Sequence, residues 1–143
     1  MVGCFLPLIT ALEKRQIKVV SVDDVPKPCT KPPEEVEKLL PESQIAIITA
    51  TAIINKTIDN LLELADSCRE VAVLGPSTPL LTEAFSQTTV SCLSGIRILE
   101  PEKVLQIIGE GGGFYIESIF FKTHFNFQYK GISVFQKKDR KNP

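Results

Sequence analysis

Three short runs of β-branched residues, each almost continuously apolar, constrain the fold of this chain more than any other feature. They are residues 17–22 (IKVVSV), 45–49 (IAIIT) and 71–74 (VAVL). A strand with one face in water alternates apolar and polar residues, whereas a strand covered on both faces reads as a continuous apolar run. The three runs therefore predict parallel strands in a sheet that is buried on both sides.

Helical patterns alternate with these strands. Apolar residues recur at helical spacing in five segments, and prolines open several of them. We expect helices over residues 6–15, 33–40, 57–67, 79–85 and 101–108. Thr78 would cap the fourth helix, and Val104, Leu105 and Ile108 would face the core from the fifth. The alternation predicts a three-layer, Rossmann-like α/β domain with a mostly parallel sheet and helices on both faces.

The C-terminal part of the chain is less regular. Weaker strand patterns occur at residues 88–93, 97–98 and 132–136. The aromatic segment 114–129 fits either a helix that leads to the last strand or a hairpin that turns at Lys130 and Gly131, and the helix is the preferred interpretation. Residues 137–143 are polar and predict a frayed tail.

Length and composition indicate a single domain over residues 1–143. Charged residues make up 23% of the 143 residues and the formal net charge is −1, so the chain lacks the basic field that nucleic acid requires. The apolar opening stretch is too short to span a bilayer. Four cysteines without a CxxC pair favour a reducing compartment, so we expect a cytoplasmic protein that binds neither nucleic acid nor membrane.

Loops that follow the strands carry the candidate ligand-binding residues. Parallel sheets bind ligands beyond the carboxyl ends of their strands, where glycines let the backbone approach and hydroxyls and amides donate hydrogen bonds. The candidates for ligand binding are Gly3, Phe5, Thr49, Thr51, Asn55, Gly75, Pro76, Ser77, Thr78, Gly95, Gly111, Gly112 and Gly113.

Several of these residues also have a purely structural interpretation. Ser77 or Thr78 would serve equally well as the N-cap of the helix expected at 79–85. In the same way, Asn55 would serve as the N-cap of the helix expected at 57–67. The glycine triplet 111–113 would end one helix before another element begins. The pattern alone leaves both interpretations open.

Two acids and two cysteines complete the candidate chemistry. Asp23 and Asp24 follow the strand at 17–22, where dinucleotide-binding folds place the acid that binds a ribose, but the GxGxxG fingerprint is absent. Cys4 and Cys29 follow the first and second strands and would present soft sulfur ligands to a metal at the same edge. Cys68 and Cys92 are interpreted as packing residues, and His124 as a partly buried surface residue.

The order of motifs resembles a known family. The succession Gly3-x-Phe5-x-Pro7, IITATAIINKTIDNLLELA (47–65), VAVLGPSTPL (71–80) and LSGIRILEPEKVLQIIGEGGG (93–113) is similar to the prokaryotic family called "putative heavy-metal chelation". The resemblance implies a Rossmann-like domain that follows a smaller, enolase-like N-terminal domain, with a site between the two. This sequence departs from the pattern because that N-terminal domain is absent and Ala50 replaces a more usual glycine.

The leading functional hypothesis is a binding module for a small anionic or metal-bearing ligand, consistent with the heavy-metal or metallo-cofactor role that the resemblance implies. A first alternative is an enzyme with a nucleotide cofactor held by Asp23 or Asp24. A second is an interaction subunit, either a homo-oligomer or one that completes a separately encoded partner domain, because half of the family's pocket would then come from another chain.

Overall fold

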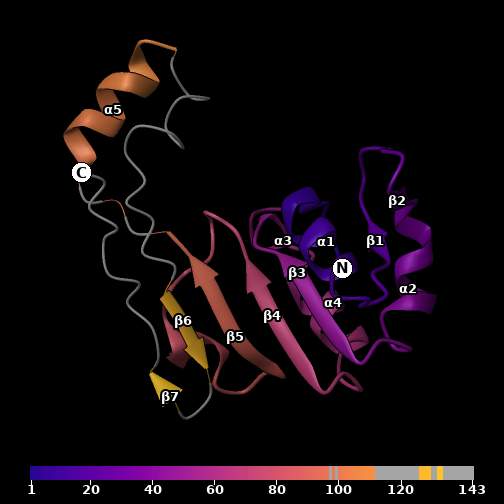
Figure 1. The fold of residues 1–143 in the computed structure, drawn as a ribbon. Coiled ribbons are helices and arrows are strands. Elements are labelled where there is room, and N and C mark those ends of the chain that lie inside the picture. The colour runs from indigo at the N-terminus through magenta and orange to yellow at the C-terminus, as the bar shows by residue number, and fades with distance from the viewer. Residues whose placement is uncertain (97, 99, 112–125, 130–131, 134–143) are drawn as a thin grey trace.

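The structure is a computed structural model, and it describes residues 1–96, 98, 100–111, 126–129 and 132–133 (Figure 1). Its larger sheet has five strands in the order β3-β4-β5-β6-β7. The first three are parallel, and β6 and β7 are antiparallel to their neighbours. The strands are β3 (Ile45–Thr49), β4 (Glu70–Leu74), β5 (Val90–Gly95), β6 (Asn126–Tyr129) and β7 (Ile132–Ser133).

A single residue joins this sheet to a second, two-stranded one. Strands β1 (Ser21–Val22) and β2 (Thr30–Lys31) pair in parallel, and Val2 forms parallel bridges to Val22 on one side and Ile48 on the other. The Val2 N–H donates to the carbonyl of Ile47 at 2.7 Å, and the Val2 carbonyl accepts from Thr49 N at 2.9 Å. The carboxyl ends of β1 and β3 therefore lie on either side of the first residues of the chain.

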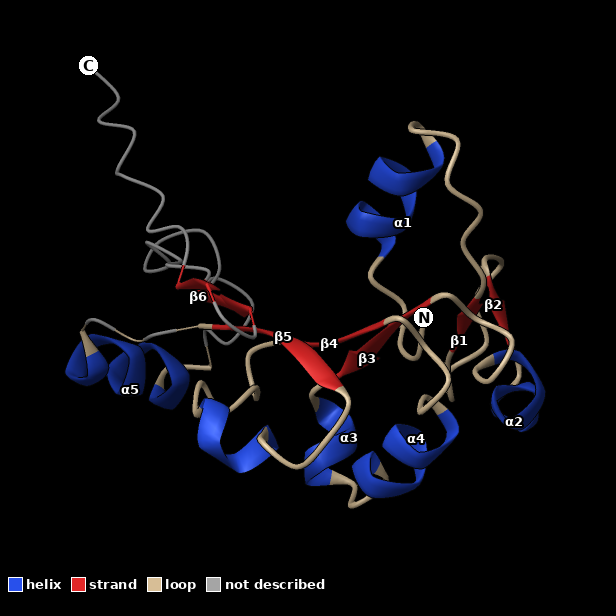
Figure 2. Ribbon diagram, turned by 90° about the horizontal axis from the view of Figure 1, so that it is seen from below, coloured by secondary structure: helices blue, strands red, loops and turns tan. Residues whose placement is uncertain are grey.

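Helices cover both faces of the sheet. Figure 2 shows α1 on one face and α2, α3 and α4 on the other, which confirms the predicted three-layer, Rossmann-like architecture. The helical segments are α1 (Leu6–Glu13), η1 (Pro33–Glu35), α2 (Val36–Leu39), α3 (Thr51–Ile54), α4 (Ile58–Leu64), η2 (Thr82–Phe85) and α5 (Pro101–Gly109), of which η1 and η2 are 3₁₀ helices.

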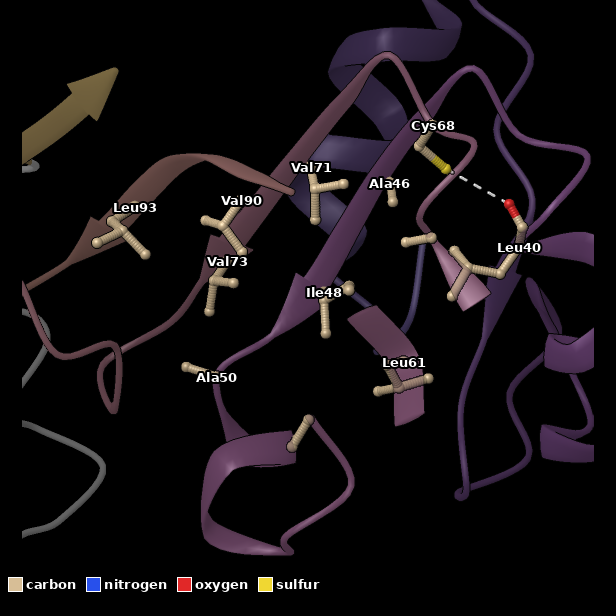
Figure 3. Packing of buried hydrophobic residues seen from close by; sticks show 12 residues of the cluster. Leu40, Ala46, Ile48, Ala50, Leu61, Cys68, Val71, Val73, Val90 and Leu93 are labelled. Carbon is tan, nitrogen blue, oxygen red and sulfur yellow. Dashed lines mark hydrogen bonds between the residues drawn. The ribbon is translucent and has the colours of Figure 1, made fainter. Parts of the chain in front are cut away.

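The core lies where α4 packs against β3, β4 and β5 (Figure 3). Ile48, Val71 and Val73 are fully buried there, and Ile45, on the same strand as Ile48, is 48% exposed. The thiol of Cys68 is buried and lies 3.5 Å from the carbonyl oxygen of Leu40, as expected for a packing residue. Long β-branched side chains on the central strands thus fix the sheet on which the loops are built.

The clearest sequence predictions are confirmed. The run 45–49 forms β3, the run 71–74 forms β4 with one added residue, and the helices expected at 6–15, 57–67 and 101–108 form α1, α4 and α5. The helix expected at 33–40 forms as the 3₁₀ helix η1 followed directly by α2. The run 17–22 pairs as a strand only at its last two residues. It pairs there with the two-residue strand β2 on one side and with Val2 on the other.

The predicted helix over 79–85 and its Thr78 cap are wrong. Only a 3₁₀ turn forms, at Thr82–Phe85, and Thr78 lies in the segment before it. A Cβ atom at Gly95 would lie 2.9 Å from the Thr78 carbonyl oxygen, so this segment runs directly over β5. Leu80 then packs on the core. These contacts with a distant strand outweigh the local signals for a helix start.

The C-terminal predictions need a second correction. The segment expected to be helical contains strand β6, which pairs antiparallel with β5 and with β7, as the hairpin interpretation required. Strand β6 forms because it pairs with β5, which lies more than thirty residues earlier in the chain. Such long-range pairing cannot be predicted from local periodicity. The strand expected at 88–93 lies at Val90–Gly95, Ile98 is in no strand, and β7 is described only at Ile132–Ser133. Arg97, residues 114–125, Lys130, Gly131 and residues 134–143 lie outside the described residues.

Helix α5 contacts the core less than its pattern predicted. Val104 is buried at 8% exposure, but Leu105 and Ile108 are 69% and 53% exposed. Only one side of this helix meets the described part of the protein, so the inward orientation expected for Leu105 and Ile108 is wrong. The amphipathic spacing predicts that these residues form a helix, but it does not predict which part of the protein the helix packs against.

Candidate functional site

A cavity of about 430 Å³ opens beside the carboxyl ends of β1 and β3. Its apolar lining includes Val22, Val36 and Leu61. Its polar side chains come from the loop after β1, from the end of β3, from the first residue of α3 and the residue that follows this helix, and from the start of α4. They are Asp23, Asp24, Thr49, Thr51, Asn55, Thr57 and Asn60. The residues Gly3, Cys4 and Phe5 complete the wall, so six of the predicted site residues meet in this cavity: Gly3, Cys4, Phe5, Thr49, Thr51 and Asn55.

Gly3 shapes the wall because no other residue fits there. Its φ angle is +94°, and a Cβ atom at this position would lie 2.9 Å from Cβ of Thr49. Both the backbone conformation and the close approach exclude a side chain. The chain therefore turns sharply out of the sheet at Gly3 and carries Cys4 and Phe5 over the cavity.

The turn after β3 supplies hydroxyls. Thr49 Oγ1 donates to Thr51 Oγ1 at 3.2 Å, which aligns the two side chains at the cavity edge. Asn55 follows α3, and the N-cap of α4 is Thr57, which makes no side-chain capping bond. The capping interpretation of Asn55 is therefore wrong, and its exposed side chain faces the cavity. Ala50 has a φ angle of −65°, which explains why alanine is accepted where the family pattern has glycine.

Asp23 organises the loop that borders the cavity. Its carboxylate accepts from the backbone N–H of Cys4 at 2.9 Å, from that of Val25 at 3.0 Å, and from the Lys27 ammonium at 2.9 Å. Burial alone would raise the pKa of Asp23, but these three donors outweigh it and lower the pKa below its usual value. Because all three donors are internal, Asp23 is occupied by the fold, and Asp24 is the acid that remains for a ligand.

The two cysteines predicted to bind metal lie together. Cys4 Sγ and Cys29 Sγ are 3.5 Å apart, although the residues are 25 positions apart in the sequence. Cys29 is exposed and Cys4 is half-buried. Partial burial and the hydrogen bond with Cys29 raise the pKa of Cys4. The pair stands at the rim of the cavity, because Cys4 belongs to its wall and Cys29 contacts Cys4 from outside it.

The second group of predicted residues lies along the same sheet edge but outside this cavity. A Cβ at Gly75 would lie 3.5 Å from Ala50 Cβ, so the loop of Gly75, Pro76, Ser77 and Thr78 adjoins the β3 turn. Thr78 is buried against Gly95, and its hydroxyl has no hydrogen-bond partner among the described residues. No helix starts at Pro79, so the helix N-terminus that was expected to hold an anion here does not form.

Gly111 has the structural role. Its φ angle is +80°, and its N–H donates to the carbonyl of Ile108 at 3.0 Å, which is how a glycine ends a helix. A Cβ there would meet nothing within 4 Å. The helix-stop interpretation of this position is therefore confirmed, and Gly112 and Gly113 lie outside the described residues.

Sequence reasoning missed two polar residues of the cavity. Thr57 is the N-cap of α4 and Asn60 lies in its first turn, where both are ordinary helix-start residues. For Asp24 the sequence predicts only a role as a ribose ligand. Neither spacing nor composition signals that this turn faces Gly3, because that proximity arises when Val2 inserts between β1 and β3.

The charge of the cavity favours a cation. The charged side chains in its lining are Asp23 and Asp24, and neither lysine nor arginine is among the lining residues. The nearby Lys27 is already paired with Asp23. No group of three or more histidine, cysteine, aspartate or glutamate side chains with metal-binding geometry occurs in the part of the chain that the structure describes. A metal bound by the cysteine pair would therefore keep other ligands of its own.

Comparisons with known proteins identify the family. The model of the DUF364 family, with the description "Putative heavy-metal chelation", matches residues 1–127. A DUF364 protein of unknown function from Desulfitobacterium hafniense is 29% identical with a TM-score of 0.71, and the match covers 78% of this chain and 45% of that one. Another, from Pyrococcus horikoshii, is 26% identical with a TM-score of 0.75, covering 82% and 49%.

A curated relative gives the same picture. An uncharacterized protein of Methanocaldococcus jannaschii is 28% identical over 68 residues, which are 48% of this chain and 26% of that protein. The chain thus spans about half the length, or less, of the relatives that it matches. None of the helices that the structure describes is long and apolar enough to cross a membrane. From the extent of the family match and the shared fold, this chain belongs to the DUF364 family.

Proposed function

We propose that this protein binds a heavy-metal ion, or a small molecule that carries one, at the cavity beside β1 and β3. The observation that carries the proposal is the 3.5 Å separation of Cys4 Sγ and Cys29 Sγ at the rim of that cavity. Thiolates are the soft ligands that thiophilic metal ions prefer. The family description points to the same chemistry.

The spacing of the two sulfur atoms suits one shared metal ion. Two sulfurs that each lie about 2.3 Å from a tetrahedral ion are roughly 3.8 Å apart. The observed separation is 3.5 Å, so side-chain rotation alone would admit the ion. Because Cys29 is exposed, an incoming metal reaches the pair without a change in the core.

The donor set of the protein is incomplete, and this favours a metal that arrives with other ligands. Two sulfurs fill two positions of a four-coordinate ion, which leaves two positions for water or for a chelating small molecule. The cavity next to Cys4 has room for such a molecule, and hydroxyl and amide side chains line it. The sequence left open an anionic or a metal-bearing ligand. Because Asp23 is paired with Lys27, the carboxylate of Asp24 in the cavity lining favours the metal-bearing ligand.

Cadmium titration of the reduced protein tests the proposal. We expect one cadmium ion per chain, detected by native mass spectrometry and by thiolate-to-cadmium charge-transfer absorption. Cys4→Ser or Cys29→Ser should each decrease the cadmium affinity by at least about 10-fold. Cys92→Ser is the matched control, because this half-buried thiol belongs to β5 and should leave binding unchanged. Cadmium affinity that is equal in the wild type and in both site variants would refute the proposal.

The nucleotide-cofactor alternative can be separated in the same assay. With Asp23 occupied by internal donors, Asp24 is the acid that would hold a ribose. Nucleotide binding that Asp24→Ala abolishes, together with no cadmium binding by the cysteine pair, would favour this alternative over the metal site.

A further inference from the structure

The cysteine pair has a second chemical property that metal binding does not use. The two thiols come from separate segments, and they are in contact on the surface of the protein. The other two cysteines differ from them, because Cys68 is buried in the core and Cys92 lies half-buried in β5. The pair therefore combines the proximity and the accessibility that thiol exchange requires.

The local structure positions the backbone of Cys29 so that its side chain can rotate toward Cys4. Cys29 lies at the tip of a tight turn that two hydrogen bonds between Lys27 and Thr30 close. The Thr30 N–H donates to the Lys27 carbonyl at 3.0 Å, and the Lys27 N–H donates to Thr30 Oγ1 at 2.9 Å. Asp23 ties this turn to Cys4, because its carboxylate binds both the Lys27 ammonium and the Cys4 N–H. The turn fixes the backbone, and the Cys29 side chain at its tip is exposed.

A disulfide needs the two sulfur atoms to approach to about 2.05 Å. The remaining gap from 3.5 Å is within the range that rotation of two side chains covers. We propose that Cys4 and Cys29 form a reversible disulfide that removes both sulfur donors and so switches the metal site off. The regulatory consequence rests on the proposed function, whereas the disulfide itself does not.

The oxidant that fits this pair is a low-molecular-weight disulfide. The exposed Cys29 thiolate attacks one sulfur of that disulfide, forms a mixed disulfide and releases one small thiolate, which takes up the proton that Cys29 lost. The Cys4 thiolate then attacks Cys29 Sγ and expels the second small thiolate, which takes up the proton of Cys4. The protein loses two electrons and two protons, and the small disulfide is reduced to two thiols.

Oxidised glutathione is the probe for the covalent step. The full chain is incubated with it under non-denaturing conditions, and the free thiols are then trapped with iodoacetamide and the products analysed by intact mass and peptide mapping. We expect monomers that have lost two alkylatable thiols and two hydrogen atoms, with Cys4 and Cys29 cross-linked. Cys92→Ser should behave as the wild type, and Cys4→Ser should stop at a glutathione adduct on Cys29.

Two results would overturn the disulfide. One is a glutathione adduct on Cys29 of the wild type that persists without a cross-link to Cys4. The other is cross-linking that involves Cys68 or Cys92 in place of this pair.

Cadmium binding by the oxidised protein tests the switch. We expect a decrease in affinity of at least about 10-fold on oxidation, reversed by dithiothreitol. A reduced protein that binds cadmium but forms no disulfide would overturn this inference and leave the proposed function standing. A protein that forms the disulfide but binds no cadmium when reduced would overturn the proposed function and the switch, with the disulfide retained.

Discussion

At the scale of single residues, the candidate site depends on Asp23, a carboxylate in the cavity lining that accepts three hydrogen bonds from within the protein. Asp23 holds Cys4 through its backbone N–H and holds the Cys29 turn through Lys27, so its role is to position both cysteines. The sequence placed Asp23 correctly after a strand and suggested a ribose as its partner, whereas the structure shows its carboxylate bound to the N–H groups of Cys4 and Val25 and to the Lys27 ammonium. A carboxylate after a strand is equally suited to a ribose hydroxyl or to the amides of its own loop, and only the three-dimensional positions of the donors distinguish the two.

Asp23→Asn should destabilise the protein. The amide keeps the shape of the side chain but loses the charge that three donors share, so we expect a decrease of about 1–3 kcal/mol in the free energy of unfolding. Urea denaturation measures this. Asp24→Asn is the control, because the neighbouring acid is exposed and its replacement should change the stability by less than about 0.5 kcal/mol. Equal effects of the two substitutions would contradict the positioning role.

At the scale of elements, the central strands follow their sequence pattern closely and the connecting segments do not. The sequence predicts strand β3 to the residue, because a five-residue run rich in β-branched residues is too short for a buried helix and suits a strand covered on both faces. The segment after β4 contains a threonine and a proline that are typical of a helix start, but Thr78 lies over Gly95 and residues 78–81 belong to no helix. Local signals decide an element only where no distant surface competes for the same residues.

Two isoleucines of β3 provide a test of that central element. Ile48 is fully buried and Ile45 is 48% exposed on the same strand. We expect Ile48→Ala to lower the free energy of unfolding by about 2–5 kcal/mol, because it removes buried methyl groups and leaves a cavity. Ile45→Ala should cost less than about 1 kcal/mol. Chemical denaturation of both variants measures the difference, and similar losses would mean that β3 packs in another register.

At the scale of the whole molecule, the position of Val2 makes the site. Its N–H and carbonyl bind β3, and the residues on either side of it bind β1 and its flank: Met1 through its amino group and carbonyl, and Gly3 through its N–H. Without this insertion the loop of Asp23 and the turn of Thr49 would belong to separate sheets. The cavity therefore arises from the docking of the first residues between two distant strands.

Val2→Pro should loosen this connection. Proline has no N–H to donate to the Ile47 carbonyl, so we expect faster hydrogen exchange in residues 20–31, with β4 still protected. Val2→Ala keeps the N–H and serves as the control. Exchange measured by mass spectrometry distinguishes the two, and unchanged protection of residues 20–31 in Val2→Pro would show that this pair of strands docks by other contacts.

The sequence by itself determined the α/β class, the parallel central strands and the helical segments at 6–15, 33–40, 57–67 and 101–108. These follow from hydrophobic periodicity, which acts within a few residues and is written in the order of the amino acids. Only the tertiary structure decided that Cys4 meets Cys29, that Asp23 is occupied, and that the loop 75–78 lies outside the cavity. These facts depend on contacts between residues far apart in the chain, whose free energies are set by the packed arrangement and leave no local pattern.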